Sequence, residues 1–243
     1  MAEPFLSVII PAHNEESRLP STLQQVLTFL STQPYSFEVL VVENASQDRT
    51  LEVAQAFARQ NAMLKVVQCP QRGKGFAVRQ GMLAARGEYR FMCDADLSMP
   101  VSEIARFLPP VLSGVDIAIA SREAAGAIRY DEPYYRHLIG RVYNNLTRLL
   151  LLPGLQDTQC GYKCFRGAVV EQLFSRQRLG GWSFDVEILF IARRRGMRMV
   201  EVPISWTYTP GSKVSVIKSA LRVILDLLTI RLNGWRGVYE RSL

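Results

Sequence analysis

Two carboxylates separated by one residue follow a short, largely apolar run in the first half of the chain. Asp94 and Asp96 flank Ala95, directly after a β-prone stretch over residues 89–93. Residues i and i+2 of a strand point to the same side, so the two carboxylates would repel each other. A divalent cation that is also bound by a diphosphate would relieve that repulsion, because such cations prefer hard oxygen ligands. Two solvated aspartates before a helix capped by Asp96 or Ser98 would give the same pattern, so both interpretations stay open on this motif alone.

The elements that must position this pair alternate regularly. Apolar runs predict strands over residues 5–10, 37–42, 63–67, 89–93 and 116–120. Helices are predicted between them: one from about residue 18, one ending near 60, one opening at 72–75 and ending near 87, and one starting at Pro100. This alternation predicts βαβ units and an α/β fold with a mostly parallel central sheet flanked by helices. Ligands of such sheets bind beyond the carboxyl ends of the strands.

Polar side chains gather at that predicted edge of the sheet. Asn14 and Glu15 follow the first strand, Glu43 and Asp48 follow the second, and Arg122 follows the fifth. Independent solvated loops would have no need to carry such residues at one shared edge. We therefore expect a single site built from several strand ends.

The second half of the chain is less regular. Helices are predicted over residues 133–152 and 214–232, and another follows residues 180–187 and ends near 195. Residues 157–165 and 198–202 are predicted to be extended. No internal repeat or Pro/Ser-rich linker interrupts the chain, so we expect one domain over residues 1–243.

The composition is that of an ordinary globular protein with a basic balance. Of 243 residues 48% are hydrophobic and 21% are charged, and the formal net charge is +7. The charge favours anionic partners such as phosphorylated substrates or anionic lipid. The four cysteines form no Cys-x-x-Cys pair, which predicts reduced thiols in a cytosolic setting. No signal peptide and no apolar run of the roughly 18 residues that a membrane span needs are evident.

The order of motifs resembles that of family 2 glycosyltransferases with the GT-A fold. Within that family the resemblance is greatest to the dolichyl-phosphate β-glucosyltransferases, a group related to the polyprenyl-phosphate mannose synthases. The resemblance covers nearly the whole chain. It rests on residues 8–16, 41–50, 73–75, 94–96, 121–122, 157–163 and 181–187. It implies that residues 1–122 bind a nucleotide sugar and that residues 123–243, with their amphipathic helices, bind the acceptor.

The resemblance also implies roles for residues of the first half. The residues expected to wall the nucleotide are Pro11, Ala12, Asn14 and Glu15. Glu43 would hold the base or ribose hydroxyls, although many relatives carry Asp-Asp where this chain has Glu43-Asn44. Asp48 would contact the donor, cap a helix, or do both. Lys74, between two glycines, would face a phosphate, and a simple turn before a helix is the alternative.

Metal binding is implied for the carboxylate pair. Asp94 and Asp96, with Ala95 between them, would hold Mg²⁺ or Mn²⁺ on the donor diphosphate. Mannose synthases of this type often carry Gln two residues after the second aspartate, where this chain has Ser98. The candidates for contact with an acceptor phosphate are Arg122, Arg136, Lys163 and, from its Gly-Ser-Lys loop, Lys213. A solvated surface charge is the alternative for each of them. Trp182 completes the set of residues expected to bind substrate.

Three further acids bear on the reaction. A hydroxyl acceptor needs a general base, and Asp157 is then the best candidate. A phosphate acceptor needs none, because its second pKa is about 6. Asp185 and Glu187 would in that case bind sugar hydroxyls, orient Lys163 or steady positive charge on the anomeric carbon. Both acids also fit the first turn of a helix that Ser183 caps.

The function implied by the resemblance is an inverting transfer of glucose from UDP-glucose to a dolichyl or other polyprenyl phosphate. Mannose transfer from GDP-mannose and transfer to a hydroxyl remain alternatives, and a nucleotide-sugar-binding protein without turnover is a remote one. The amphipathic segments 134–152 and 214–232 would either lie on the cytoplasmic face of a membrane, with the protein peripherally attached, or simply cover the sheet. No recognition helix or aromatic-basic platform for nucleic acid stands out, and the oligomeric state is not predicted.

Overall fold

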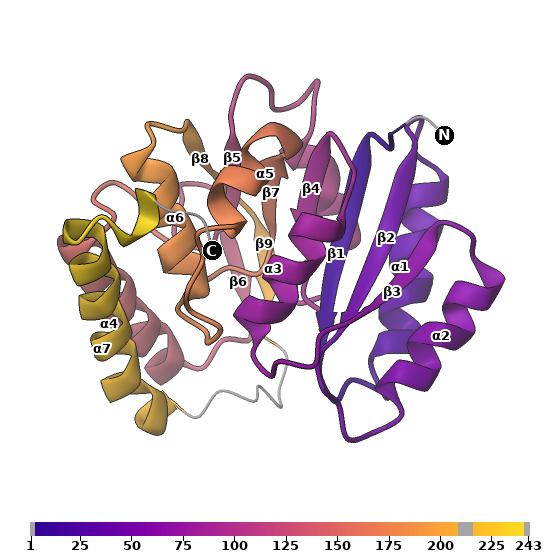
Figure 1. The fold of residues 1–243 in the computed structure, drawn as a ribbon, viewed down its shortest axis with the longest axis horizontal. Coiled ribbons are helices and arrows are strands. Elements are labelled where there is room, and N and C mark those ends of the chain that lie inside the picture. The colour runs from indigo at the N-terminus through magenta and orange to yellow at the C-terminus, as the bar shows by residue number, and fades with distance from the viewer. Residues whose placement is uncertain (1–2, 209–215, 241–243) are drawn as a thin grey trace.

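A seven-stranded sheet forms the centre of the molecule (Figure 1). The computed structural model describes residues 3–208 and 216–240, with side chains of the last helix described from residue 222 onward. The strands of this sheet are β1 (Leu6–Ala12), β2 (Phe37–Glu43), β3 (Leu64–Gln68), β4 (Tyr89–Met92), β5 (Ile117–Ser121), β7 (Lys163–Arg166) and β8 (Met199–Pro203). Their order is β3-β2-β1-β4-β7-β5-β8, so both halves of the chain contribute to one sheet.

The predicted α/β fold with a mostly parallel sheet is confirmed. Strand β7 runs antiparallel to its neighbours β4 and β5, and the other described pairings of this sheet are parallel. A short second sheet pairs β6 (Ile128–Tyr130) with β9 (Ser205–Thr207). The sequence did not predict these two strands, because three residues are too few to show a periodic pattern.

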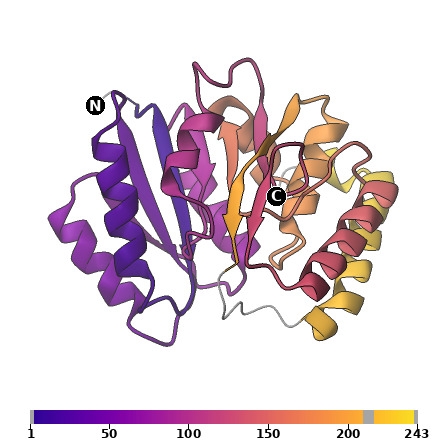
Figure 2. The same cartoon turned by 180° about the vertical axis from the view of Figure 1, so that it is seen from behind.

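Helices cover both faces of the sheet. Helices α1 (Leu19–Ser31) and α2 (Thr50–Gln60) lie on one face with the 3₁₀ helix η1 (Val101–Phe107), as Figure 2 shows for α1 and α2. Helices α3 (Lys74–Ala84), α5 (Gly167–Phe174) and α6 (Phe184–Arg194) lie on the other face. Helices α4 (Tyr134–Leu150) and α7 (Val216–Trp235), with the turn η2 (Val238–Glu240), form one end of the molecule.

Burial of β1 shows how the sequence specifies these layers. Its residues alternate between the two cores, with Val8 and Ile10 packed beneath α1 and Ile9 packed beneath α3. A strand covered on both faces has to be apolar on both sides, which explains the continuous hydrophobic run. Strands β1 and β2 begin at the top of Figure 1 and end at its lower edge, where the polar loops gather.

Two elements differ from the predicted pattern. The segment after Pro100 forms the short 3₁₀ helix η1 in place of an α-helix, and the pair Pro109-Pro110 follows it closely. Helix α5 was not predicted, because its short apolar run resembles a strand. All four cysteines are free and buried. Within the described part of the chain, no helix has the length and apolar character needed to cross a bilayer.

Candidate active site

The carboxylate pair lies where β4 ends, next to the neighbouring strand β1. Ser98 donates its backbone N–H to Asp96 Oδ1 at 3.1 Å, which fixes the turn after the strand. Burial of its carboxyl group and the negative charge of Asp94 both raise the pKa of Asp96. The backbone oxygen of Ala95 accepts a hydrogen bond from Thr22 Oγ1 at 2.6 Å, so Ala95 supports the turn from α1. The two like charges therefore meet as predicted, and a cation would stabilise them together.

Lys74 supplies positive charge next to this pair. It starts α3 directly after Gly73, whose φ of 143° a side chain would disfavour. Lys74 Nζ lies 2.7 Å from Asp94 Oδ1 and 5.2 Å from the centroid of the Trp182 ring. Burial disfavours the ammonium, but the carboxylates of Asp94 and Asp185 outweigh that effect and raise the pKa of Lys74. Lys74 and Trp182, both predicted to bind substrate, thus lie together with Asp94.

The donor set fits a divalent cation that is shared with a ligand. Among the described residues, no group of three or more His, Cys, Asp or Glu is placed to enclose a metal ion. Asp94 and Asp96 supply two hard carboxylate groups, and Asp94 already attracts the ammonium of Lys74. An ion held there would take its remaining ligands from diphosphate oxygens and water, as Mg²⁺ commonly does.

The backbone of Gly161, in the loop before β7, packs closely against the side chain of Asp94. A Cβ atom placed on Gly161 would lie 2.0 Å from Asp94 Oδ2 and 2.6 Å from its carboxyl carbon. Any side chain at position 161 would force Asp94 to shift, so glycine lets the loop before β7 approach Asp94 this closely. The glycine of the 157–163 motif is thereby explained as a support for the carboxylate pair.

Arg122 and Asp157 form a buried bidentate ion pair. Arg122 donates from Nε to Asp157 Oδ2 at 2.7 Å and from Nη2 to Oδ1 at 3.0 Å, and its backbone N–H donates to Oδ2 at 3.1 Å. Gln159 adds a backbone N–H bond to Oδ1 at 3.1 Å. Burial alone would raise the pKa of Asp157, but the charge and hydrogen bonds of Arg122 lower it to about 2. A fully bonded carboxylate with that pKa is a poor proton acceptor at neutral pH, which argues against Asp157 as a general base.

Lys163 and Asp185 form a second buried pair. Lys163 Nζ lies 2.7 Å from Asp185 Oδ1 and donates to the backbone oxygen of Cys160 at 2.6 Å. Lys163 is 2% exposed, because β7 is an inner strand that α6 covers. Burial raises the pKa of Asp185, and the charges of Lys163 and Lys74 offset part of that rise. The predicted contact of Lys163 with an acceptor phosphate therefore has no support in this structure and stays a prediction, whereas the pairing agrees with the predicted role of Asp185 in orienting Lys163.

Glu187 does not reach the site. Its Oε2 accepts hydrogen bonds from the backbone N–H groups of Arg178 and Leu179, and its Oε1 accepts one from the Tyr239 hydroxyl. The residue is completely buried, and burial raises its pKa. The predicted contact of Glu187 with substrate has no support in this structure, because α6 is buried along its length and Glu187 bonds to the loop before it.

The loops after β1 and β2 interlock at the expected nucleotide side. Asn14 donates its backbone N–H to Ser46 Oγ at 3.1 Å and accepts at Oδ1 from the Gln47 N–H at 2.8 Å. Glu15 pairs with Arg18 at 2.8 Å. Pro11 and Ala12 form the last two residues of β1, and Ala12 is buried. The four predicted residues thus lie at the end of β1 and in the loop that follows it, which contacts the loop after β2.

Two acids of the β2 loop make bonds within the protein. Glu43 accepts at Oε1 from the Ser46 N–H at 2.6 Å. Asp48 accepts at Oδ1 from the Thr50 N–H at 3.0 Å and at Oδ2 from the Glu16 N–H at 3.1 Å. Burial raises the pKa of Asp48, but these hydrogen bonds stabilise the carboxylate and lower the pKa overall. Asp48 thus binds the backbone N–H of Thr50, the first residue of α2, from the position before the N-cap Arg49.

One residue that the sequence reasoning passed over connects these loops to Lys74. Asn44 accepts at Oδ1 from the Gly73 N–H at 2.8 Å and donates from Nδ2 to the backbone oxygens of Cys69 and Gln71. This side chain therefore holds the loop that starts α3. Its position directly after a strand, where many relatives carry an acid, was the available signal.

Arg136 lies at the start of α4, beside the short second sheet. Its guanidinium lies 5.1 Å from the centroid of the Tyr208 ring. Its Nε is buried and makes no hydrogen bond within the part of the chain that the structure describes. An unsatisfied buried cationic donor of this kind suits an anionic ligand. Lys213, the remaining candidate for the acceptor phosphate, lies outside the described residues.

Comparison of the sequence with known protein families assigns the chain to a family. Residues 7–174, most of the chain, match the sequence profile described as glycosyl transferase family 2. The chain belongs to this family. The chain is accordingly a glycosyltransferase.

Two curated relatives of this glycosyltransferase are dolichyl-phosphate beta-glucosyltransferases. The one from Drosophila melanogaster is 36% identical over 253 residues, which cover 97% of this chain and 77% of the relative. The one from Homo sapiens is 32% identical over 250 residues, with coverage of 97% and 77%. Both relatives are thus matched over nearly the whole of this chain.

Solved structures confirm the GT-A fold. The glucosyl-3-phosphoglycerate synthase from Mycobacterium tuberculosis, solved with UDP, matches with a TM-score of 0.70 at 21% identity, covering 94% of this chain and 80% of that one. The same synthase with Mn²⁺, UDP-glucose and phosphoglyceric acid matches with a TM-score of 0.68 at 19% identity and the same coverage. At these identities the likeness concerns the fold alone.

Proposed function

We propose that this glycosyltransferase moves glucose from UDP-glucose to a dolichyl or other polyprenyl phosphate, with inversion at the anomeric carbon. The names of its curated relatives support the donor sugar and the lipid acceptor. The choice of a phosphate acceptor over a hydroxyl also has support in the geometry of this chain.

The observation that carries the proposal is the state of Asp157 and Asp185, two candidate acids of the second half of the chain outside the metal pair. Asp157 is held by Arg122 through two side-chain bonds, and Asp185 is paired with Lys163 in a buried position. Neither carboxylate is placed to take a proton from a sugar or protein hydroxyl, which a hydroxyl acceptor would require. A phosphate monoester is largely dianionic at neutral pH and attacks without a base. The site therefore suits an acceptor that arrives already ionised.

At the donor side, Asp94 and Asp96 would hold Mg²⁺ or Mn²⁺. Such an ion, when bound, neutralises negative charge on the departing nucleoside diphosphate. The mycobacterial synthase of the same fold was solved with Mn²⁺ and UDP-glucose, which is consistent with this assignment. Lys74, beside Asp94, adds a fixed positive charge on the same side, and Trp182 lines the space next to it.

At the acceptor side, Arg122 and Arg136 would bind the lipid phosphate, with Lys213 as a third candidate. Asp157 fixes the plane of the Arg122 guanidinium, so the cation is presented in one orientation. One phosphate oxygen then forms a bond to the anomeric carbon while the bond from that carbon to UDP breaks. The electron pair leaves with UDP, and attack from the opposite side inverts the configuration.

A two-phase assay tests the proposal. The full chain is incubated with radiolabelled UDP-glucose, polyprenyl phosphate and Mn²⁺ or Mg²⁺, and the organic extract is counted. We expect metal-dependent label in the organic phase, and none with Asp94→Asn or after chelation. Label from GDP-mannose alone would replace the donor in the proposal. Hydrolysis or transfer to a hydroxyl compound, with no lipid product from either donor, would refute the phosphate acceptor.

A further inference from the structure

Helices α4 and α7 expose an unusual amount of apolar surface. They pack against each other at one end of the molecule (Figures 1 and 2). The large hydrophobic side chains exposed on α4 are Tyr134, Tyr135, Leu138, Ile139, Val142 and Leu149. Those exposed on α7 are Ile224, Leu225, Leu228, Leu232 and Trp235. Their spacing of three, four or seven residues places each set on one side of its helix, and we call the two sets together the outer face.

Helix α4 is apolar on both sides: Tyr143, Leu146 and Leu150 pack against the core, yet further apolar side chains point outward. Its buried residues are the polar Asn144 and Thr147, at 6% and 0% exposure. Its most exposed residues are the apolar Leu149 and Tyr134, at 81% and 80%. A helix that only covered the sheet would carry mainly polar side chains on its outer side. Contiguous apolar surface of this kind marks an interaction site.

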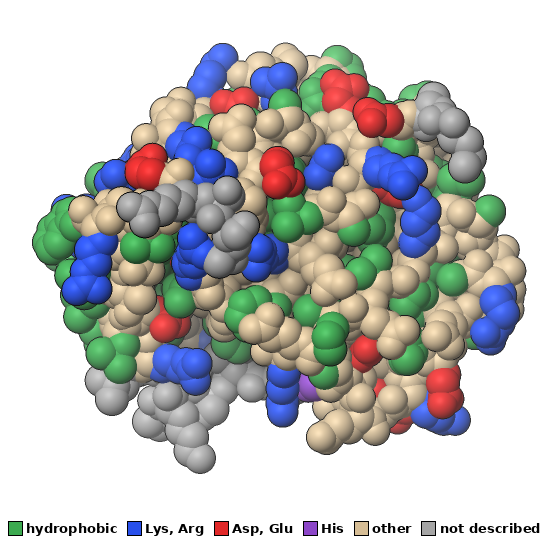
Figure 3. Space-filling model, viewed as in Figure 1, with side chains coloured by type: hydrophobic (Ala, Val, Ile, Leu, Met, Phe, Trp, Pro, Cys, Tyr) green, Lys and Arg blue, Asp and Glu red, His purple; other side chains and the backbone are tan. Residues whose placement is uncertain are grey.

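The charges around the outer face are almost all positive. Helix α4 contains no Asp or Glu but has exposed Arg141 and Arg148. Helix α7 adds exposed Arg222 and Arg231 among its described side chains. The single acid of α7 is Asp226, which is half-buried and accepts a hydrogen bond from Ser183 Oγ at 2.7 Å. Figure 3 shows hydrophobic and basic side chains together at this end of the molecule.

We propose that the outer face of α4 and α7 docks onto the surface of an anionic lipid bilayer. Apolar side chains interspersed with arginines, and exposed tyrosines and tryptophan, are what the headgroup region of such a bilayer accommodates. A second copy of this chain would bring the arginines of two outer faces together, and the absence of exposed acids on α4 leaves that repulsion uncompensated. Charge complementarity therefore selects anionic lipid as the occupant.

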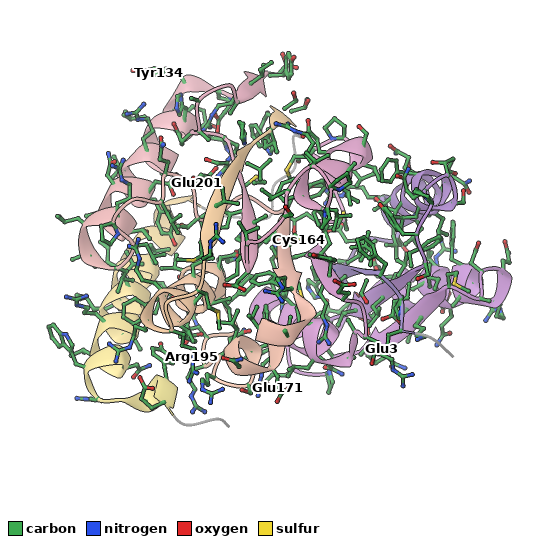
Figure 4. All side chains as sticks on the ribbon, turned by 90° about the horizontal axis from the view of Figure 1, so that it is seen from above. Glu3, Tyr134, Cys164, Glu171, Arg195 and Glu201 are labelled. Atoms are coloured by element: carbon green, nitrogen blue, oxygen red, sulfur yellow. The ribbon has the colours of Figure 1, made fainter. Side chains whose placement is uncertain are left out.

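The placement of the helices fits access to a membrane-bound substrate. Both helices begin at the lower edge of Figure 1, the edge at which β1 and β2 end. Figure 4 shows Tyr134, the first residue of α4, on the outside of the molecule and away from the sheet. Arg136, two residues later, carries the unsatisfied buried Nε of the candidate site. A bilayer under the outer face would thus meet the protein beside the site, and docking itself does not require turnover.

Sedimentation with lipid vesicles tests the proposal on the full chain. The probes are vesicles of phosphatidylcholine alone and of phosphatidylcholine with phosphatidylserine. We expect binding that is stronger to the anionic vesicles and weaker at high salt. The double variant Leu149→Ser/Trp235→Ser should lower the partition coefficient by at least about tenfold, because it removes two exposed apolar anchors. Val111→Ser is the matched control, since Val111 is 69% exposed in the loop between η1 and β5, and it should change nothing.

Reversing the charge of arginines on α4 measures the electrostatic contribution to vesicle binding. The double variant Arg141→Glu/Arg148→Glu should lose at least about tenfold on anionic vesicles and much less on neutral ones. Arg59→Glu, an exposed arginine on α2 at the other end of the molecule, should behave like the parent chain. Thermal melting and UDP binding at parental values confirm that the variants are folded.

Three results would overturn the inference. The first is the absence of binding to either vesicle type. The second is binding that the outer-face variants leave unchanged. The third is a dimer in light scattering that Leu149→Ser/Trp235→Ser dissociates, because a second copy would then cover the outer face. Loss of lipid glucosylation with vesicle binding intact would instead count against the proposed function, so the two proposals fail separately.

Discussion

Replacing Asp157 with Asn tests whether Asp157 positions Arg122 or acts as a general base. A positioning residue should cost stability and leave turnover measurable, whereas a base should cost turnover and leave stability unchanged. Both carboxylate oxygens accept hydrogen bonds, Oδ2 from Arg122 Nε and its backbone N–H, and Oδ1 from Arg122 Nη2 and the Gln159 N–H. An asparagine would turn its own NH₂ group toward two of these donors. The variant would also leave the Arg122 guanidinium without its buried counter-charge.

The magnitude follows from the pKa of Asp157, which falls from an ordinary 3.8 to about 2. This difference corresponds to roughly 2–3 kcal/mol of folding free energy at neutral pH. Because the folded pKa is depressed, the stabilisation is fully present above pH 3.8 and is lost as the pH falls toward 2. With the uncompensated arginine added, Asp157→Asn should lower the free energy of unfolding at pH 7 by about 2–5 kcal/mol.

The assay is urea unfolding at pH 7 together with steady-state turnover on the lipid phosphate. Arg166→Gln is the control, because its ion pair with Asp116 is partly exposed and should be worth less than about 1 kcal/mol. If Asp157 only positions Arg122, the destabilised variant keeps measurable turnover, the KM for the acceptor rises, and the pH profile of kcat keeps its shape. An unchanged unfolding free energy with kcat reduced by about 10²–10⁴-fold would refute this reasoning and restore Asp157 as the base.

Three other substitutions test the assignments of the site. Gly161→Ala should lower kcat by about 10²-fold with loss of metal-dependent UDP binding, because the new Cβ displaces Asp94. Gly140→Ala, in open space on α4, is its control and should keep activity, which an effect of added bulk anywhere in the chain would contradict. Glu187→Gln should keep turnover within a few-fold in the two-phase assay, because an amide can satisfy the same loop N–H groups and hydroxyl; a tenfold rise in the donor KM at parental stability would show substrate contact. Lys74→Met should raise the Kd for UDP in calorimetry, and an unchanged Kd would place the ammonium outside the donor site.

The regular first half of the chain explains why so much of the fold could be predicted from sequence. Each strand there is a run of apolar residues followed by a polar cluster, so the alternation identified both the sheet and the edge that carries the site. The carboxylate pair and Lys74 lie together, and Arg122 follows another strand that ends at the same edge, because such strands end at a common edge. That inference needs only the direction of the strands and no detail of packing.

Burial in the second half could not be predicted in the same way. Lys163 and Glu187 carry charges that a sequence pattern assigns to the surface, yet both are buried beneath or within α6. Their partners, Asp185 for one and Tyr239 for the other, are distant in the chain. Whether a charged group faces a ligand or an internal partner depends on such contacts. The interlocking of Asn44 with the loop before α3 depends on them too.

One segment joins the candidate site to the outer face. Ser183 donates from Oγ to Asp226 of α7, and two residues later Asp185 pairs with Lys163 and acts on Lys74 through its charge. The start of α6 is therefore bonded on one side to a helix whose exposed side chains suit a bilayer and on the other to the charges beside Asp94. A shift of α7 upon docking would have to move Ser183 or break its hydrogen bond to Asp226. Ser183 and Asp185 thus connect α7 to the charges beside Asp94 through one short turn.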